Sequence, residues 1–492
     1  MGILNLFNRQ DLPKPDTSTT STYNLRYLET VLSQWLLSDL REEQLLADKY
    51  YAGDHDILQR KRKVIGADGN LVEINNVANN KLVDNLYRKL VDQKTNYVLG
   101  KPLTIATEKE EYLKELTKVF NKKVHRQLRV LARYAVNGGI AWLYPYYGED
   151  KQFHIAMFPA YEICPIWRDK AHTELECAMR YYKEEVFTDK GGTKIVEHVE
   201  LFSETGITQY ERRGGSLIQT GFNTYMTQGE QPLAWERLPI IPFKYNDTET
   251  PLIRNVKCLQ DALNQVLSDF QNNMEEDPRS TILVLKNYDG TNIPEFRQNL
   301  ATYGVIKVTT VDGVQGGVET LNVEVNAQNY QAILMQLKRA IVENGRGFDA
   351  KEERMDGDPN QMNIESMYTD IDLDVNAMET EFQAGFEELK WFVDQYLVHQ
   401  NKGDYTEEDV EFVFNRDIFI NEDAKIENCV KSSGIISRKT ILTRHPWVTN
   451  VEHELKQIEE DKLEDMKEME ATMKLESNNS PKPSSSDGGK VK

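Results

Sequence analysis

The stretch NVKCLQDALNQVLSDFQNNMEED, residues 255–277, has the periodicity of one long amphipathic helix. Apolar side chains recur every three or four positions, as they do along the buried face of a helix: Val256, Leu259, Leu263, Val266, Leu267, Phe270 and Met274. The opposite face is polar and holds Gln260, Asp261, Asn264, Gln265, Ser268 and Asn272. With a rise of 1.5 Å per residue, the stretch predicts a rod roughly 36 Å long.

A second helix is predicted in NYQAILMQLKRAIVENGRG, residues 329–347, with an apolar stripe of its own: Tyr330, Ile333, Leu334, Leu337 and Ile341. Four short runs separate the two helices, and they predict a strand, a short helix and two further strands: STILVLKNYDG (280–290), IPEFRQNLATYG (293–304), VIKVTT (305–310) and GGVETLNVEV (316–325). The two helices therefore predict a stalk that carries a small α/β module.

An acidic loop, GRGFDAKEERMDGDPNQMN (345–363), follows the second helix, and its centre resembles the start of a calcium-binding loop. An EF-hand needs oxygen ligands at positions 1, 3 and 5, a Gly at 6 and a bidentate Glu at 12. Asp356, Asp358 and Asn360 fit, but position 6 is Gln361 and position 12 is Met367. Asp, Gly, Pro and Asn are also the usual turn formers, so we expect a turn and no metal. The glycines at 345, 347 and 357 are expected to give the loop backbone freedom.

The rest of the chain alternates between helical and strand-like segments. One helix is predicted from about Leu25 to Tyr51, and a helical stripe follows in residues 75–105, stopped by Gly100 and Pro102: Leu82, Leu86, Leu90, Val91 and Val98. Residues 140–245 contain short β-type runs separated by turns, as in an antiparallel meander. The grouping of strands predicts the α+β class.

A third long helix is expected after the acidic loop, with apolar residues spaced by three and four: Ile371, Val375, Met378, Phe382, Phe386, Leu389, Val393 and Tyr396. A strand then follows, and after it two short helices that break at Ser433–Gly434, the second begun by Ser437. Thr449 and Glu452 form a capping box that opens a last helix. The tail SNNSPKPSSSDGGKVK (477–492) is of low complexity and is predicted to be disordered.

The composition of the chain excludes several classes of function and site. The formal charge of −20 disfavours tight duplex binding, which neutralises phosphates with Lys and Arg, but it permits a protein past which DNA slides. The four cysteines are scattered without a CxxC pair, so we expect reduced thiols and no zinc site. No apolar run approaches the roughly 20 residues of a membrane span, and the first 21 residues fit neither a signal nor a transit peptide.

No catalytic motif stands out: there is no P-loop, G-x-S-x-G, H-E-x-x-H or dinucleotide fingerprint, and the eight histidines do not cluster. We expect no enzyme activity and no cofactor. One alternative stays open, a metal-dependent enzyme that uses the acidic loop 349–358. Its candidate carboxylates share a single loop, whereas such sites normally sit on rigid elements: Asp349, Glu352, Glu353, Asp356 and Asp358.

Several stretches, in this order, resemble the portal proteins of tailed bacteriophages, in particular those of long-tailed phages of Gram-positive hosts. They are YYAGDHDIL (50–58), NNKLVDNLYRKLVDQKTNYVLGKPLTI (79–105), LPIIPFKYN (238–246), LQDALNQVLSDFQNNME (259–275) and, more weakly, GIISRKTILTRHPWVTNVEHELKQIEED (434–461). The resemblance implies a subunit of a twelve-membered ring at one capsid vertex, through which DNA enters and leaves the head. It also implies a virion location, with host cytoplasm during assembly, and as partners terminase, a head–tail adaptor, and the major capsid and scaffolding proteins.

The resemblance also implies a domain plan with long stem helices, a β-rich wing, a small α/β clip and a helical crown. Its boundaries are an arm (1–23), the wing (24–253), the first stem helix (254–277), the clip (278–326), the second stem helix (327–348), a tunnel loop (349–363), a wing spine helix and strand (364–420), the crown (421–476) and the tail (477–492).

On this plan, residues of the tunnel loop and stem face DNA in the channel: Lys338, Arg346, Asp349, Lys351, Glu352, Glu353, Asp356, Asp358 and Asn360. A second set packs the stem within and between subunits: Leu259, Leu263, Val266, Phe270, Leu334, Leu337 and Ile341. The carboxylates of the loop are expected to repel phosphate, so that the duplex is guided without being gripped.

Overall fold

The computed structural model describes residues 23–65, 68–74, 77–187, 191–228, 231–233, 235–276, 282–286, 317–321, 327–349, 361–416, 422–448 and 451–478. The chain forms two compact units, Met1–Met355 with Ser366–Asp417, and Asp356–Glu365 with Ile418–Lys492. Both helices and sheets contribute to the first unit, which confirms the α+β class. Among the described helices, none combines the length and apolar composition that crossing a bilayer requires.

The first unit begins with two helices where the sequence predicted one. α1 (Leu25–Leu36) ends at Leu37, and α2 (Asp39–Ala52) starts after Ser38, whose hydroxyl accepts a hydrogen bond from the backbone N–H of Arg41. The prediction of one continuous helix was wrong. The apolar spacing continues across Ser38, but this serine is an N-cap: its hydroxyl satisfies a backbone N–H in the first turn of a second helix.

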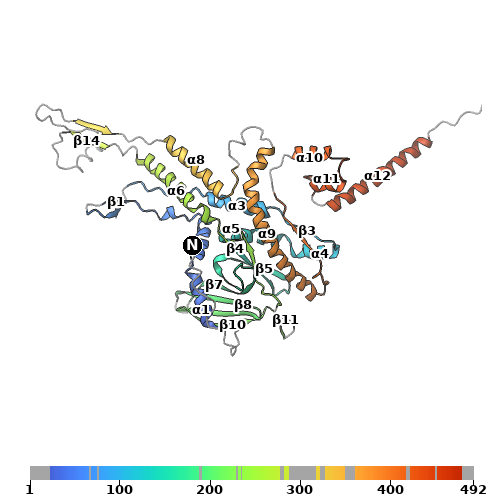
Figure 1. Cartoon of the computed structure of the whole chain (residues 1–492), viewed down its shortest axis with the longest axis horizontal. Coiled ribbons are helices and arrows are strands. Elements are labelled where there is room, and N and C mark those ends of the chain that lie inside the picture. Colours follow the sequence, from blue (N-terminus) through green and yellow to red (C-terminus); the bar gives the residue numbers. More distant parts are fainter. Residues whose placement is uncertain are drawn as a thin grey trace, which may run out of the picture. The chain divides into compact units, whose positions relative to one another are not determined.

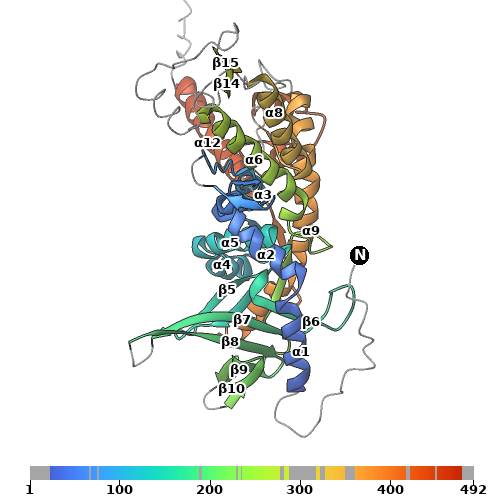
Figure 2. The same ribbon diagram turned by 90° about the vertical axis from the view of Figure 1, so that its left-hand side faces the viewer.

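The predicted β meander is confirmed as a five-stranded antiparallel sheet in the order β10-β9-β8-β7-β6. Its strands are β6 (Ile163–Trp167), β7 (Leu175–Phe187), β8 (Thr193–Ser203), β9 (Gly206–Arg213) and β10 (Ser216–Asn223). Leu28 and Leu32 of α1 pack on one face of this sheet together with Cys164 and Cys177, and all four cysteines of the chain are free thiols. Figure 2 shows α1 lying along the sheet.

A second layer lies between this sheet and the long helices of the unit. It consists of a three-stranded sheet, β13 (Ile241–Lys244), β4 (Ile140–Tyr147) and β5 (Phe153–Pro159), packed on α5 (Lys122–Gly138). Around it lie α3 (Leu86–Leu99), α4 (Glu110–Val119), η2 (Asp56–Gln59) and η3 (Ala160–Glu162). Small pairings complete the unit: β1 (Lys63–Ile65) with β2 (Leu71–Glu73), β3 (Thr104–Ala106) with β16 (Glu411–Val413), and β11 (Met226–Gln228) with β12 (Gln231–Leu233).

The spine of the unit is α9 (Gln361–His399), which belongs to this unit from Ser366 onward. All eight residues of its predicted apolar stripe are at most 3% exposed, so the predicted helix and its buried face are confirmed. Phe382 and Phe386 contact Phe243 of β13 edge to face, and Val393 and Tyr396 pack against Tyr112 of α4. The spine thus joins the sheet layer to α4.

The predicted stalk is the pair α6 (Ile253–Glu276) and α8 (Ala327–Asn344), which lie side by side in Figure 1. Between them in the chain, β14 (Ile282–Lys286) pairs antiparallel with β15 (Gly317–Leu321), which confirms two of the three strands predicted for the small module. The predicted helix 293–304 and the strand 305–310 lie outside the described residues.

The second unit contains α10 (Glu422–Lys431), α11 (Arg438–Arg444) and α12 (Val451–Asn478). The break at Ser433–Gly434 and the start at Ser437 are as predicted, since the Ser437 hydroxyl accepts a hydrogen bond from the backbone N–H of Thr440. Thr449 of the expected capping box, the arm 1–22 and residues 479–492 lie outside the described residues.

Candidate functional site

The two helices of the predicted stalk, α6 and α8, pack antiparallel. Near the C-terminal end of α6, the ring of Phe270 lies 5.0 Å from that of Tyr330 at the start of α8, and the Asn273 amide donates to the Tyr330 hydroxyl at 2.8 Å. Leu263 and Ile341 are fully buried within the single chain. The other five predicted stem-packing residues are half-buried: Leu259, Val266, Phe270, Leu334 and Leu337.

The stem also exposes apolar side chains that the single chain does not cover. Met274 of α6 is 50% exposed, and on α8 Ile333 is 45% and Met335 is 68% exposed. Burying apolar side chains of this kind against another molecule is favourable by about 25 cal/mol for each Å² removed from water.

The polar face of α6 is buried against the segment 79–85, which runs along it in extended form. An amphipathic helix usually turns its polar face to water, but four residues of this face, spaced by four, are fully buried: Gln260, Asn264, Ser268 and Asn272. We call these four residues the polar ladder. Asp261 and Gln265, the other two polar residues of that face, remain accessible.

The polar ladder binds every second amide of the extended segment. The backbone N–H of Asn80 donates to Asn272 at 2.7 Å, that of Leu82 to Ser268 at 3.0 Å, and that of Asp84 to Asn264 at 3.0 Å. Two residues of extended chain advance about 6.6 Å and four residues of helix advance about 6.0 Å, so the two repeats stay in register over the two steps that separate the three bonds.

Gln260 and Asn264, at the N-terminal end of the polar ladder, fix the start of α3 and the protonation state of a buried histidine. Gln260 accepts from the backbone N–H of Tyr87 at 3.1 Å and donates to the carbonyl of Asp84 at 2.8 Å. His55, 1% exposed, accepts a 2.8 Å bond from the Asn264 amide at Nδ1, and its Nε2 lies 3.1 Å from the Tyr50 carbonyl. The imidazole is therefore neutral with its proton on Nε2, and burial lowers the pKa of His55.

Two turns further along, α3 holds the first residues of the acidic loop. Gln93 binds both backbone groups of Phe348: its amide donates to the Phe348 carbonyl at 2.6 Å, and its oxygen accepts from the Phe348 N–H at 3.2 Å. A Cβ on Gly345 or Gly347 would come within 2.4 or 2.2 Å of Leu90. A side chain at either position would have to displace Leu90, so close packing on α3 is a second reason for glycine here, and the expected backbone freedom stays a prediction.

A buried lysine connects α3, the loop base and the spine. Lys94 is fully buried, pairs with Asp374 of α9 at 2.6 Å and donates to the carbonyl of Arg346 at 3.1 Å. Asp374 also accepts a 2.5 Å bond from the Tyr245 hydroxyl. Burial lowers the pKa of Lys94 and the neighbouring Asp374 carboxylate opposes that shift. Arg346 has a φ of +46°, so the backbone turns here with a non-glycine residue in the left-handed region.

The sequence-predicted channel residues divide into two groups. Three that the structure describes have partners in the same chain: Lys338 lies 2.8 Å from Asp84, Arg346 lies 3.6 Å from Asp374, and Asp349 lies 3.3 Å from Lys89. The other six lie outside the described residues: Lys351, Glu352, Glu353, Asp356, Asp358 and Asn360. The structure thus describes the base of the predicted tunnel loop.

Gln93 and Lys94 were missed by the sequence reasoning. A signal for Lys94 existed, because it lies four residues from both Leu90 and Val98 and therefore falls on the apolar stripe of its helix. A lysine in such a stripe is either at the edge of the core or paired inside it. Gln93 carries no comparable signal.

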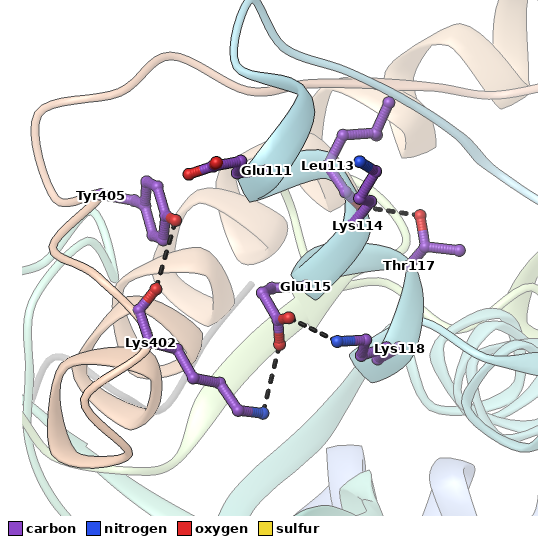
Figure 3. Close-up of a pocket in the computed structure, with 8 residues that line it drawn as sticks. All are labelled: Glu111, Leu113, Lys114, Glu115, Thr117, Lys118, Lys402 and Tyr405. Carbon is purple, nitrogen blue, oxygen red and sulfur yellow. Dashed lines mark hydrogen bonds and ion pairs between the residues drawn. The ribbon is translucent and has the colours of Figure 1, made fainter.

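A surface pocket of about 600 Å³ between α4 and the turn after α9 offers no catalytic arrangement. Glu115 is held between Lys118 at 2.5 Å and Lys402 at 3.2 Å, and the hydrogen bond from Lys118 lowers the pKa of Glu115 (Figure 3). A carboxylate paired in this way is neither a raised-pKa acid nor a free base. In the part of the chain that the structure describes, no three His, Cys, Asp or Glu side chains gather as a metal site would require.

Comparison with known proteins identifies the class as that of phage portal proteins. The chain belongs to the family "Phage portal protein, SPP1 Gp6-like", whose model matches residues 40–468. It is 28% identical over 443 residues to the portal protein of Bacillus phage SPP1, covering 88% of this chain and 86% of that protein. It is 29% identical over 436 residues to the portal protein of Clostridium phage phiCD119, covering 86% of this chain and 94% of that protein.

Among solved structures, one chain from the virion of a native gene transfer agent particle aligns over 72% of this chain and 88% of its own length. The identity is 12% and the TM-score 0.41. A chain from the neck of the empty particle aligns with 11% identity and a TM-score of 0.42, again over 72% of this chain and 88% of its own length.

We expect Asn264→Ala to destabilise the first unit. The substitution leaves the backbone N–H of Asp84 and Nδ1 of His55 without partners in a buried site, at about 1–3 kcal/mol for each group. Thermal unfolding and hydrogen exchange of residues 80–87 measure the effect. The matched control is Gln265→Ala, one position along and exposed, which should change stability by less than about 0.5 kcal/mol. Equal effects of the two substitutions would contradict the ladder.

The neutral His55 predicts a loss of stability in acid. Because its pKa is lowered in the folded chain, the unfolded chain binds the proton more readily, so stability falls as pH drops below about 6.5. Asp56 and Asp261 lie near the ring and oppose part of this shift. We expect wild type to be more stable than His55→Asn at pH 7.5 and to lose this advantage by at most about 1.4 kcal/mol per pH unit towards pH 5. Melting curves of both proteins at each pH test this, and a constant difference would refute it.

Proposed function

We propose that twelve copies of this chain form a ring at one vertex of a phage head, and that double-stranded DNA passes through the ring during packaging and ejection. The observation that carries this proposal is the family match along residues 40–468, together with two relatives that are portal proteins. The exposed apolar side chains on the stem supply a physical reason for association between copies. The ring would be a virion component that is assembled in the host cytoplasm.

Within that ring we assign the wing to 24–253 with 364–420, the stem to 254–277 and 327–348, the clip to 278–326 and the crown to 421–476. In this plan the clip docks terminase during packaging and the head–tail adaptor afterwards. Major capsid and scaffolding proteins would surround the ring at the vertex. The antiparallel pair α6 and α8, with β14 and β15 between them in the chain, supports a stem that carries the clip.

The loop 349–363 is assigned as the tunnel loop, with its carboxylates towards the DNA. A negative loop repels phosphate, so it positions the duplex without the counterion release that makes binding tight. We infer a structural and mechanical role and no enzyme activity, in line with the membership of the portal family. The metal-dependent alternative needs the same carboxylates to gather around a cation, and the loop experiment below separates the two.

One prediction of this proposal concerns the ring. Wild type should elute as a particle many times its 56.9 kDa mass and show a ring with a central hole by negative stain. Met335→Asp places a charge on the exposed stem surface, so we expect folded chains with a normal circular dichroism spectrum that no longer form rings. Leu263→Asp places a charge in the core of the single chain and should prevent folding instead. Normal rings from Met335→Asp would count against the stem interface.

The second prediction concerns the loop. Replacing Asp349, Glu352, Glu353, Asp356 and Asp358 with Asn or Gln should leave melting and ring size nearly unchanged, because loop substitutions usually cost under about 0.5 kcal/mol and the partly exposed pair of Asp349 with Lys89 is worth at most about 1 kcal/mol. DNA retention should rise in a salt-sensitive way and packaging should slow, because repulsion of phosphate is removed. Filter binding across a salt series and in vitro packaging measure these effects.

The control for the loop removes five acids from α12 instead: Glu454, Glu459, Glu460, Asp461 and Glu464. It changes the net charge equally, so retention that rises in both variants reflects overall charge and refutes a role specific to the loop. A calcium- or magnesium-dependent rise in the melting temperature of wild type that is lost in the loop variant would support the metal-dependent enzyme.

A further inference from the structure

We propose that Gln93 and Lys94 of α3 are positioning residues for the tunnel loop, and that they fix its base relative to stem helix α6. This proposal rests on the proposed function of the loop, since it says how the chain aims that loop at DNA. It concerns residues 345–349, which the structure describes, and it gives two polar side chains of the wing a role in DNA passage.

The first argument is the geometry of Gln93. One side-chain amide binds both the N–H and the carbonyl of Phe348, at 3.2 and 2.6 Å, as a neighbouring strand would. Two bonds to one residue fix its orientation as well as its position. The close contacts of Gly345 and Gly347 with Leu90 hold the preceding residues on the same face of α3.

The second argument is the burial of Lys94. Removing an ammonium group from water is costly unless it is paired and hydrogen-bonded, and Lys94 meets Asp374 at 2.6 Å and the Arg346 carbonyl at 3.1 Å. The burial of Lys94 is therefore favourable only when the loop base lies in this position. If the base moved away from α3, a buried charge would lose one of its two partners.

The third argument is that the chain segments on both sides of the loop meet at α3. The ring of Phe348, just before the loop, stacks on Tyr368 of α9, just after it, with centroids 4.4 Å apart. Tyr97 of α3 stacks on Tyr368 from 6.0 Å, and its hydroxyl donates to Asp372 at 2.6 Å. Phe348 before the loop and Tyr368 beyond it are thus both held close to α3.

The fourth argument is the connection from α3 to the stem. The backbone N–H of Tyr87, at the start of α3, binds Gln260 of α6, and Lys94 lies seven residues, about 10 Å, along the same helix. A rigid helix of this length transmits position between its ends. The loop base is therefore placed with respect to α6, and not only through α8, which precedes the loop in the chain.

The test uses the full-length ring with Gln93→Ala, which removes both bonds to Phe348. The matched control is Gln127→Ala on α5, where the same side chain, also half-buried, donates to one backbone carbonyl, that of Ile155, at 3.0 Å. Hydrogen exchange of peptides covering 345–349 reads out the anchor without DNA. Packaging into procapsids reads out its consequence, with ring size and melting temperature recorded for each variant.

We expect exchange at 345–349 to become about tenfold faster in Gln93→Ala, the effect of losing one well-made hydrogen bond and part of another, and to stay unchanged in Gln127→Ala. Packaging should slow several-fold in Gln93→Ala alone, while both variants form normal rings. A double variant, Lys94→Met with Asp374→Asn, removes the buried pair without leaving a buried charge alone, since Arg346, the other partner of Asp374, is exposed; it should slow packaging in the same way.

Three results would overturn the proposal. Unchanged exchange in Gln93→Ala means that the anchor does not hold the base. Faster exchange with normal packaging, while the loop-neutralised variant packages slowly, means that the loop matters and its positioning by Gln93 does not. Normal packaging by the loop-neutralised variant as well means that the proposed function of the loop fails, and the positioning role fails with it.

Discussion

The hydrogen bonds between the polar ladder and the segment 79–85 are the constraint on which the first unit depends. A buried N–H that loses its partner costs about 1–3 kcal/mol, and this segment presents its amides to a helix and not to another strand. Each ladder residue can serve only one step, so the register between segment and helix is unique. A slip by one residue would turn the wrong backbone groups towards all four side chains. The start of α3, and with it everything that α3 contacts, follows from that register.

From this fixed start, the same helix carries the residues that contact the loop base. The spacing is set by helix geometry: Leu90, Gln93, Lys94 and Tyr97 lie within two turns and share one side of α3. Leu90 packs on Gly345 and Gly347, Lys94 binds the carbonyl of Arg346 between them, and Gln93 binds Phe348, so all four residues 345–348 contact α3. The combination gives specificity as well as stability, because an apolar contact alone would tolerate sliding, whereas a paired charge and a two-point amide do not.

The sequence predicted the elements that rest on a single periodic pattern. All eight apolar residues of the spine are buried, and the stem pair and the break before Ser437 were found, because each signal is local. The polar ladder was not predictable, since residues spaced by four on a polar face look the same whether they meet water or a segment 180 residues away. For the same reason the close approach of Gly345 and Gly347 to the distant Leu90 was not predictable from the sequence. Only Lys94, placed in an apolar stripe, carried a local sign of its buried partner.

Two of the cations proposed to lie near the channel, Lys338 and Arg346, already pair with carboxylates of the same chain. The strength of these ion pairs decides whether the cations could still bind DNA phosphates. Lys338 pairs with Asp84 and Arg346 with Asp374, yet both side chains are about half exposed or more, and such pairs are worth less than about 1 kcal/mol. Pairing alone would not keep these side chains from phosphate. The net charge of −20 acts on every phosphate that enters, within the screening length of about 10 Å at 0.1 M salt. If the proposed channel is correct, the overall negative field, more than the weak pairing of these two cations, would therefore exclude phosphate from this surface.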